Sequence, residues 1–230
     1  MINITPAQLE AFGFEWAYHL LPDGRGVHFS FNEATHTYRV RDPFDGHCFN
    51  VPSVTTVLAS AGLRPECREI PLPVLESGSL VQKAAHLANL KALDYATLDP
   101  QVAPYFSGYE KFLKDSGFKV VYTERRVVGC WNELWWGGTI DVEGGWEGSP
   151  WILDLKCAAE DHESFKLQTA GCLLTLPKPR TPPFCYRRAT LRLRPDGTYA
   201  PPRAYTDPQD AETFLIALRL EWEKRRRKIR

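Results

Sequence analysis

Residues 151–156 form an apolar run, Trp-Ile-Leu-Asp-Leu-Lys, that carries one acid and one base. Side chains in a β-strand alternate between its two faces, so Asp154 and Lys156 would share one face while the two leucines share the other. A run this apolar is expected at the centre of a sheet, where an unpaired charge costs several kcal/mol. The sequence therefore predicts a central strand whose charged face needs a compensating ion.

A second acid comes shortly before this strand. The preceding run reads Gly-Gly-Thr-Ile-Asp-Val, and the segment 144–150 between the two runs contains three glycines and a proline. If residues 139–142 pair with residues 151–156 through a turn over that segment, Asp141 arrives beside Asp154 from the neighbouring strand. Two carboxylates and one ammonium group would then share a small site.

This combination of groups suits a divalent cation. Mg²⁺ takes oxygen ligands, usually one or two carboxylates together with waters and substrate oxygens, and the carbonyl of Leu155 could add a third protein ligand. A bound Mg²⁺ or Mn²⁺ makes a water more acidic and neutralises charge that develops on phosphorus. Lys156 would hold or deprotonate that water, or stabilise the charged transition state. The pattern therefore favours hydrolysis of phosphodiester bonds.

The rest of the chain alternates between helical and strand-like patterns. Apolar periodicity, proline and glycine positions and β-branched runs predict four helices, at residues 79–91, 105–115, 163–176 and 210–228. Ser79 would cap the first of these helices. The same signals predict strands at residues 119–128 and 186–193, and a hairpin formed by residues 35–40 and 51–58.

These elements predict an α/β fold with a mixed central sheet flanked by helices, in the core order helix, three strands, helix, strand. At 230 residues with 43% hydrophobic content, the chain can bury one sizeable core. We therefore expect a single domain over residues 1–230. It would carry an N-terminal hairpin extension, about residues 1–76, and a basic C-terminal tail at residues 224–230.

Charge is balanced overall and uneven locally. The 28 basic and 28 acidic residues cancel, so net charge neither demands nor excludes a polyanionic partner. The tail, Lys-Arg-Arg-Arg-Lys-Ile-Arg, could contact phosphates or remain a solvated helix end. No stretch of about 20 apolar residues is present, and the first ten residues lack a signal-peptide pattern. We expect a cytoplasmic protein without a membrane partner.

The strand with G-x-x-D, the strand with D-x-K and the following helix with a glutamine resemble the PD-(D/E)xK nuclease superfamily. The resemblance is closest to RecB-like and phage-type exonucleases, and it spans most of residues 28–220. Members of that group similarly have a histidine on an upstream helix and a QxxxY motif on the downstream helix. The counterparts in this chain are His86, Asp141, Asp154 with Lys156, and Gln168.

The chain departs from that pattern at three positions. Cys172 stands in place of the tyrosine of QxxxY, and Ile140 precedes Asp141 where the RecB-like branch commonly has proline. Gln82 stands where a glycine is often found, four residues before the histidine.

The resemblance implies a restriction-endonuclease-like core and a Mg²⁺- or Mn²⁺-dependent deoxyribonuclease, more exonucleolytic than endonucleolytic. It would act in recombination, repair or DNA processing in a bacterial or phage-infected cell. DNA would be the partner, and a single-strand annealing or recombination protein could be another. Asp141, Asp154, the Leu155 carbonyl and His86 would contact the metal. Gln168 would bond a phosphate oxygen or orient Lys156.

Several alternatives stay open at this point. A structure-selective or site-specific endonuclease could use the same fold, as could a catalytically silent DNA-binding protein. A glycosidase with two carboxylates is disfavoured because the lysine suits phosphate chemistry better. Glu124 could serve a second metal, or it could pair with Arg125 or Arg126. The tryptophans at 131, 135 and 136 could stack on bases, although core packing is favoured.

Overall fold

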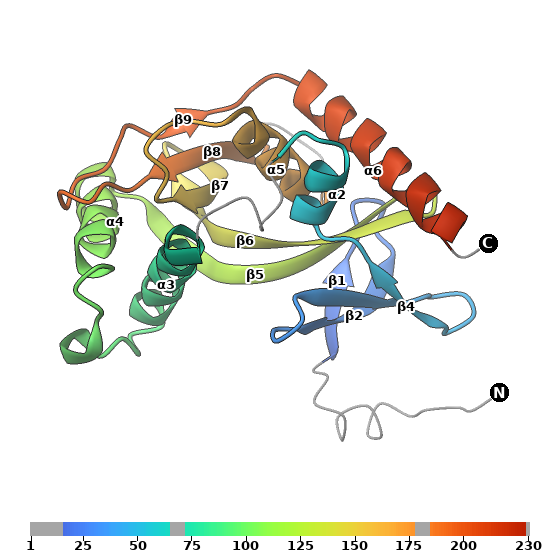
Figure 1. The fold of residues 1–230 in the computed structure, drawn as a ribbon, viewed down its shortest axis with the longest axis horizontal. Helices are drawn as coiled ribbons and strands as arrows, with labels where there is room; N and C mark the ends of the chain where they lie inside the picture. The colour runs from blue at the N-terminus through green and yellow to red at the C-terminus, as the bar shows by residue number, and fades with distance from the viewer. Residues whose placement is uncertain (1–15, 65–71, 178–184, 229–230) are drawn as a thin grey trace.

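The computed structural model describes residues 16–64, 72–177 and 185–228. The first 15 residues of the predicted N-terminal extension, part of its later segment and the last two residues of the basic tail lie outside the described residues. Two sheets and a set of helices make a mixed α/β architecture (Figure 1). Among the described residues, every helix is too short or too polar to cross a bilayer.

The larger sheet has five strands in the order β5-β6-β7-β8-β9. The strands pair antiparallel except β7 and β8, which are parallel, so the sheet is mixed as predicted. Their bounds are β5 Lys119–Trp131, β6 Leu134–Trp146, β7 Ser149–Lys156, β8 Arg187–Arg192 and β9 Arg203–Ala204.

Helices cover both faces of this sheet (Figure 1). Leu153 and Leu155 of β7 pack in one hydrophobic cluster with α3 and α4, while Ile152 packs in a second cluster with α2, α5 and α6. The alternation of side chains along β7 therefore sends neighbouring residues into two different cores. The helices are α2 Val54–Ser60, α3 Leu72–Asn89, α4 Ala103–Ser116, α5 Glu163–Leu173 and α6 Gln209–Lys228, with a short 3₁₀ helix, η2, at Tyr95–Thr97.

The N-terminal part of the described chain is a four-stranded antiparallel sheet in the order β1-β2-β3-β4. The predicted hairpin corresponds to β3 and β4, and the structure adds two strands before it. This small sheet packs on the half of β5 and β6 that is nearest the turn between them. The contact is a third hydrophobic cluster that includes Val40, Val128 and Trp135. The bounds are β1 Trp16–Leu20, β2 Gly26–Asn32, β3 Thr37–Arg41 and β4 Cys48–Val51.

The prediction of a strand over residues 51–58 is wrong for most of that segment. β4 ends at Val51, and α2 begins at Val54. Pro52 cannot donate a ladder hydrogen bond, and the Ser53 side chain accepts a hydrogen bond from the backbone N–H of Thr56 at 3.1 Å. This N-cap overrides the strand preference of the β-branched residues that follow it.

Two other boundaries also differ from the prediction. α3 begins at Leu72, so Ser79 lies inside the helix and does not cap it. The turn between β6 and β7 is only Glu147–Gly148, because pairing continues to Trp146 and Ser149. Both turn residues have positive φ, 51° and 72°, as a tight hairpin turn requires. β6, Leu134–Trp146, begins five residues before and ends four residues after the predicted segment 139–142. The remaining predicted helices and strands of the core lie within three residues of the observed bounds.

Candidate active site

The candidate site lies where β6 and β7 separate. Their ladder ends at the pair Val142 and Leu153, so the next residues along, Asp141 and Asp154, face each other without a backbone bond between them. Instead, the backbone N–H of Leu155 donates to the Asp141 carboxylate at 2.7 Å. Asp141 and Asp154 are only 8% and 7% exposed. The predicted approach of these two acids across the hairpin is therefore confirmed.

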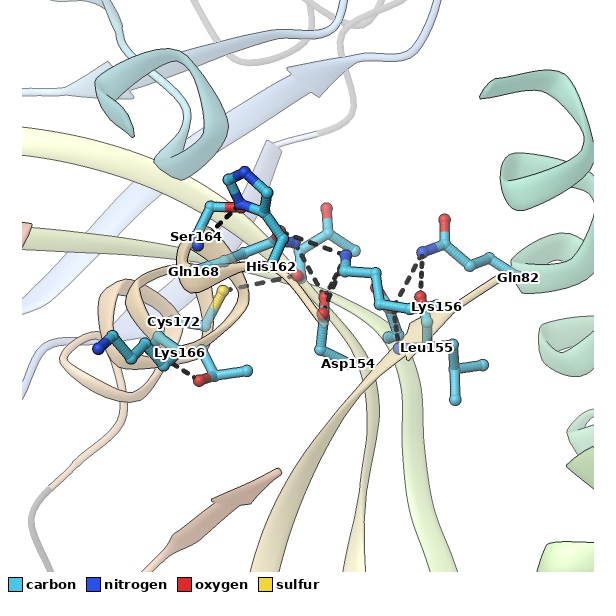
Figure 2. Close-up of polar contacts among 12 residues, drawn as sticks. Gln82, Asp154, Leu155, Lys156, His162, Ser164, Lys166, Gln168 and Cys172 are labelled. Carbon is cyan, nitrogen blue, oxygen red and sulfur yellow. Dashed lines mark hydrogen bonds and ion pairs between the residues drawn. The ribbon is translucent and has the colours of Figure 1, made fainter. Parts of the chain in front are cut away.

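Asp154 belongs to a three-residue polar cluster (Figure 2). The Lys156 ammonium lies 3.0 Å from its Oδ1 and 2.9 Å from its Oδ2. Gln168 of α5 donates its amide N–H to Oδ1 at 2.9 Å, and its amide oxygen accepts from Lys156 at 3.2 Å. Each member contacts the other two, so the orientation of Lys156 is fixed from two sides.

The register of α5 positions Gln168 for this contact. The helix begins after His162, whose side chain accepts a hydrogen bond from the backbone N–H of Ser164 at 3.0 Å. Leu167 is buried in the core beneath α5, and Gln168 follows it on the side that faces β7. The helix start therefore fixes which residue reaches the lysine.

Gln82 reaches the site from α3, on the opposite side from α5 (Figure 2). Its amide nitrogen donates to Asp141 Oδ2 at 2.9 Å and lies 3.5 Å from the carbonyl oxygen of Leu155. One side chain thus links two of the three oxygens that the sequence proposes as metal ligands. Gln82 was not among the site residues predicted from the sequence.

Burial and mutual repulsion act on the two acids. The pKa of Asp141 is raised well above its usual range, mainly by burial and then by the negative charge of Asp154, while Lys156 opposes the shift. Burial also raises the pKa of Asp154, and the neighbouring Lys156 opposes it. A single lysine does not neutralise two buried carboxylates, so a further cation would relieve the remaining charge.

The donor set fits a hard divalent cation. A cavity of about 10 Å³ is lined in part by Asp141, Asp154, Gln168 and Cys172; this is about the space of one water. Asp154 Oδ2 is buried and makes no hydrogen bond of good geometry within the described residues, although the lysine charge is near. Carboxylate and carbonyl oxygens are the ligands that Mg²⁺ and Mn²⁺ prefer.

The described residues hold no group of three or more His, Cys, Asp and Glu side chains arranged for a metal. The candidate set is accordingly two carboxylates and a carbonyl. Such a set leaves most coordination positions to water and substrate, as is usual for Mg²⁺.

His86 lies one helical turn beyond Gln82 and makes a different contact. Its Nδ1 is 2.6 Å from the hydroxyl oxygen of Thr123 in β5. A metal role for His86 stays a prediction, and the structure adds Gln82 as the α3 residue that touches Asp141. One sequence feature is consistent with a role for Gln82: Gly78 lies four residues before it, which is the glycine–histidine spacing of the nuclease group that the sequence resembles.

Glu124 lies in β5 between Thr123, which pairs with Val142, and Arg125, which pairs with Ile140, so it falls opposite Asp141. Its φ is 50°, an unusual backbone conformation for a residue with a side chain, and such strain is concentrated at functional sites. Burial raises the pKa of Glu124, and its charge in turn raises the pKa of Asp141. Glu124 therefore belongs to the electrostatic surroundings of the acid pair, and its role as a metal ligand stays a prediction.

The bases next to Glu124 are held by other acids. Arg125 pairs with Glu143 at 2.6 Å, and Arg126 pairs with Glu33 at 2.9 Å. The tryptophans before the site are mainly core residues. Trp135 and Trp136 are buried, as favoured from the sequence, whereas Trp131 is 37% exposed.

Comparison with protein-family models finds no match for this chain, and no curated protein matches it either. What the protein does is therefore inferred from the chemistry of the site.

Proposed function

We propose that the protein is a Mg²⁺- or Mn²⁺-dependent deoxyribonuclease with a restriction-endonuclease-like core, of the PD-(D/E)xK type. One observation carries the proposal. Asp141 and Asp154 are buried side by side at the point where two strands part, with the Lys156 ammonium beside Asp154 and the Gln82 amide between Asp141 and the Leu155 carbonyl. Acids in this arrangement are costly unless a cation binds.

Asp141, Asp154 and the carbonyl of Leu155 would hold the metal. When bound, the metal lowers the pKa of a water and neutralises charge on the phosphate. Asp141 is held for this role by two donors, the Leu155 N–H and the Gln82 amide. Gln82 is thus proposed as a positioning residue.

Lys156 would act on the attacking water and on the charge that develops at phosphorus. An ammonium group can donate three hydrogen bonds, and two of its contacts are already made by Asp154 and Gln168. The remaining N–H is available to a water or a phosphate oxygen. Gln168 would keep the lysine pointed toward the acids rather than toward solvent.

The preference for exonuclease action, and for recombination, repair or DNA processing in a bacterial or phage-infected cell, rests on the resemblance of the motifs. The same holds for a single-strand annealing or recombination protein as a partner. Exonuclease and endonuclease action differ in whether a closed circular duplex is cut.

Cleavage assays with matched variants test the proposal. Metal-free protein is mixed with linear, nicked and closed circular DNA, with and without Mg²⁺. We expect Mg²⁺ to start cleavage of linear DNA, EDTA to stop it, and circular DNA to stay intact. Asp154→Ala and Lys156→Ala should each lower the rate on the order of 100-fold or more, because each removes a charge from the reacting centre.

Asp99→Ala and Lys111→Ala are the controls, since both residues are exposed and lie on the α4 side of the molecule. Circular dichroism and thermal melting would verify that all four variants fold. Wild-type rates in folded Asp154→Ala or Lys156→Ala protein would refute the proposed nuclease. Cutting of the circular duplex would replace exonuclease with endonuclease action.

A further inference from the structure

A second hollow lies away from the acid pair, between the small sheet and the end of α6. This groove has a volume of about 840 Å³. Its walls come from the β3–β4 turn and β4 on one side, the turned end of β5 and β6 below, and the last turns of α6 on the other side. In Figure 1 these elements lie together near the C-terminus, at the opposite end of the large sheet from α4.

Aromatic rings line much of the groove. Phe49 and Trp135 meet edge to face with ring centroids 6.2 Å apart, and Trp222 of α6 donates its indole N–H to the Trp135 carbonyl at 2.9 Å. Phe44, at the tip of the β3–β4 turn, is 84% exposed. A single exposed phenylalanine is ordinary. Here, however, it lines the same groove as Phe49, Trp135 and Trp222, and its own ring is open to a stacking ligand.

A basic rim follows the aromatic floor. The Arg225 guanidinium lies over the Trp222 ring, 5.8 Å from its centroid, and is held by Glu221 at 2.6 Å. Arg226 and Arg227 follow it in α6, and both are exposed. Arg226 is four residues beyond Trp222 and therefore lies on the same side of the helix. Positive charge thus accumulates where the aromatic surface meets solvent.

The acids in the groove do not cancel this rim. The lining carries two acids, Asp42 and Glu133, and two bases, Arg25 and Arg225, so its formal charges balance and leave the exposed Arg226 and Arg227 in excess. Asp42 is also tied to its own turn, where its carboxylate accepts the backbone N–H of Phe44 at 2.8 Å. The floor is therefore nearly neutral and apolar, while the helix end is cationic.

We propose that this groove binds single-stranded DNA, with unpaired bases stacked on the accessible rings of the groove, first of all Phe44, and phosphates along the basic end of α6. Base stacking on aromatic side chains together with cationic groups on the backbone is how proteins hold single strands without sequence preference. Duplex DNA does not expose base faces to such rings. The inference rests on the proposed function for its choice of DNA, and it assigns a binding site separate from the acid pair.

Fluorescence anisotropy with a labelled single-stranded oligonucleotide tests this assignment. The measurements are made in EDTA, so that binding is read without cleavage. Phe44→Ala should weaken binding by about tenfold, because one stacked base is lost. Arg226→Ala combined with Arg227→Ala should weaken binding and reduce the slope of log K against log salt by about 1.4, if each arginine neutralises one phosphate.

Tyr95→Ala and Arg194→Ala are matched controls, an exposed aromatic and an exposed arginine that do not line the groove. Both should bind the oligonucleotide as the wild type does. A blunt duplex of the same length should bind more weakly than the single strand and should respond little to Phe44→Ala.

The assignment is overturned if Phe44→Ala binds the single strand with wild-type affinity, or if the duplex is bound equally well and loses as much affinity. These outcomes are separate from those for the nuclease. Binding that depends on Phe44 in a protein that never cleaves DNA would uphold the groove and refute the enzyme. Cleavage of DNA by a protein whose single-strand binding does not depend on Phe44 would support the enzyme and refute the groove.

Discussion

Asp141 shows which contacts a short sequence pattern can predict and which it cannot. The acid spacing and the glycine-rich turn predicted that Asp141 would meet Asp154, and the structure brings them together just beyond the last strand pair, Val142 and Leu153. The contact with Gln82 was missed because it comes from a helix about 60 positions earlier in the chain. A side chain that arrives from a distant element leaves no periodic signal near the acids. Only the glycine four residues before it hinted at the role.

The raised pKa of Asp141 gives a prediction about stability and pH. Its pKa is higher in the folded chain than in the unfolded chain, so the folded state binds more protons in the interval between the two values. Without metal, the free energy of unfolding should therefore fall as the pH rises from about 4 through that interval. At pH 8 the contribution of the buried acid pair to the free energy of unfolding should be at its least favourable.

Asp141→Asn removes one of the two buried charges. The metal-free variant should be more stable than the wild type at pH 8 by about 1 kcal/mol or more, since one pKa unit corresponds to about 1.4 kcal/mol, and the difference should shrink near pH 4. Urea denaturation in EDTA at several pH values measures this, with Asp99→Asn as the control. A variant less stable than the wild type at pH 8 would contradict the electrostatic account.

Among the elements, β7 and α2 illustrate opposite outcomes of pattern reasoning. β7 was predicted well, because its apolar run is buried on both faces and nothing local competes with the strand. Residues 54–58 have the β-branched composition of a strand but form a helix. The capping interaction at Ser53 and the packing of this segment on the core favour a helix over a strand. Amino-acid composition alone does not reveal this competition between helix capping and strand preference.

The β6–β7 turn carries a prediction of its own. Gly148 has φ of 72°, whereas Gly145 lies within β6 with open space around the position of a Cβ. Gly148→Ala should lower the free energy of unfolding by about 1 kcal/mol, because an L-residue is strained in the left-handed region. Gly145→Ala is the matched control and should change stability little. Equal effects of the two substitutions would show that the turn does not constrain the hairpin.

Over the whole molecule, the positions of the charged residues say more about binding than the net charge does. Acidic and basic residues are equal in number, yet the structure gathers acids where β6 and β7 part and bases at the end of α6. α3 and α5 approach the acids from opposite sides of β7, and each supplies one glutamine (Figure 2). The sequence could predict the layers from hydrophobic patterns, but not how the small sheet and α6 meet to form a groove.

A calorimetric titration of metal-free protein with Mn²⁺ tests the proposed cation site most directly. The wild type should bind Mn²⁺ with a measurable heat, and Asp141→Asn and Asp154→Asn should each lose that binding, because each replaces a charged ligand with a neutral amide. Asp99→Asn should bind as the wild type does. If folded Asp141→Asn and Asp154→Asn proteins both bind Mn²⁺ with wild-type affinity, the paired carboxylates are not a metal site.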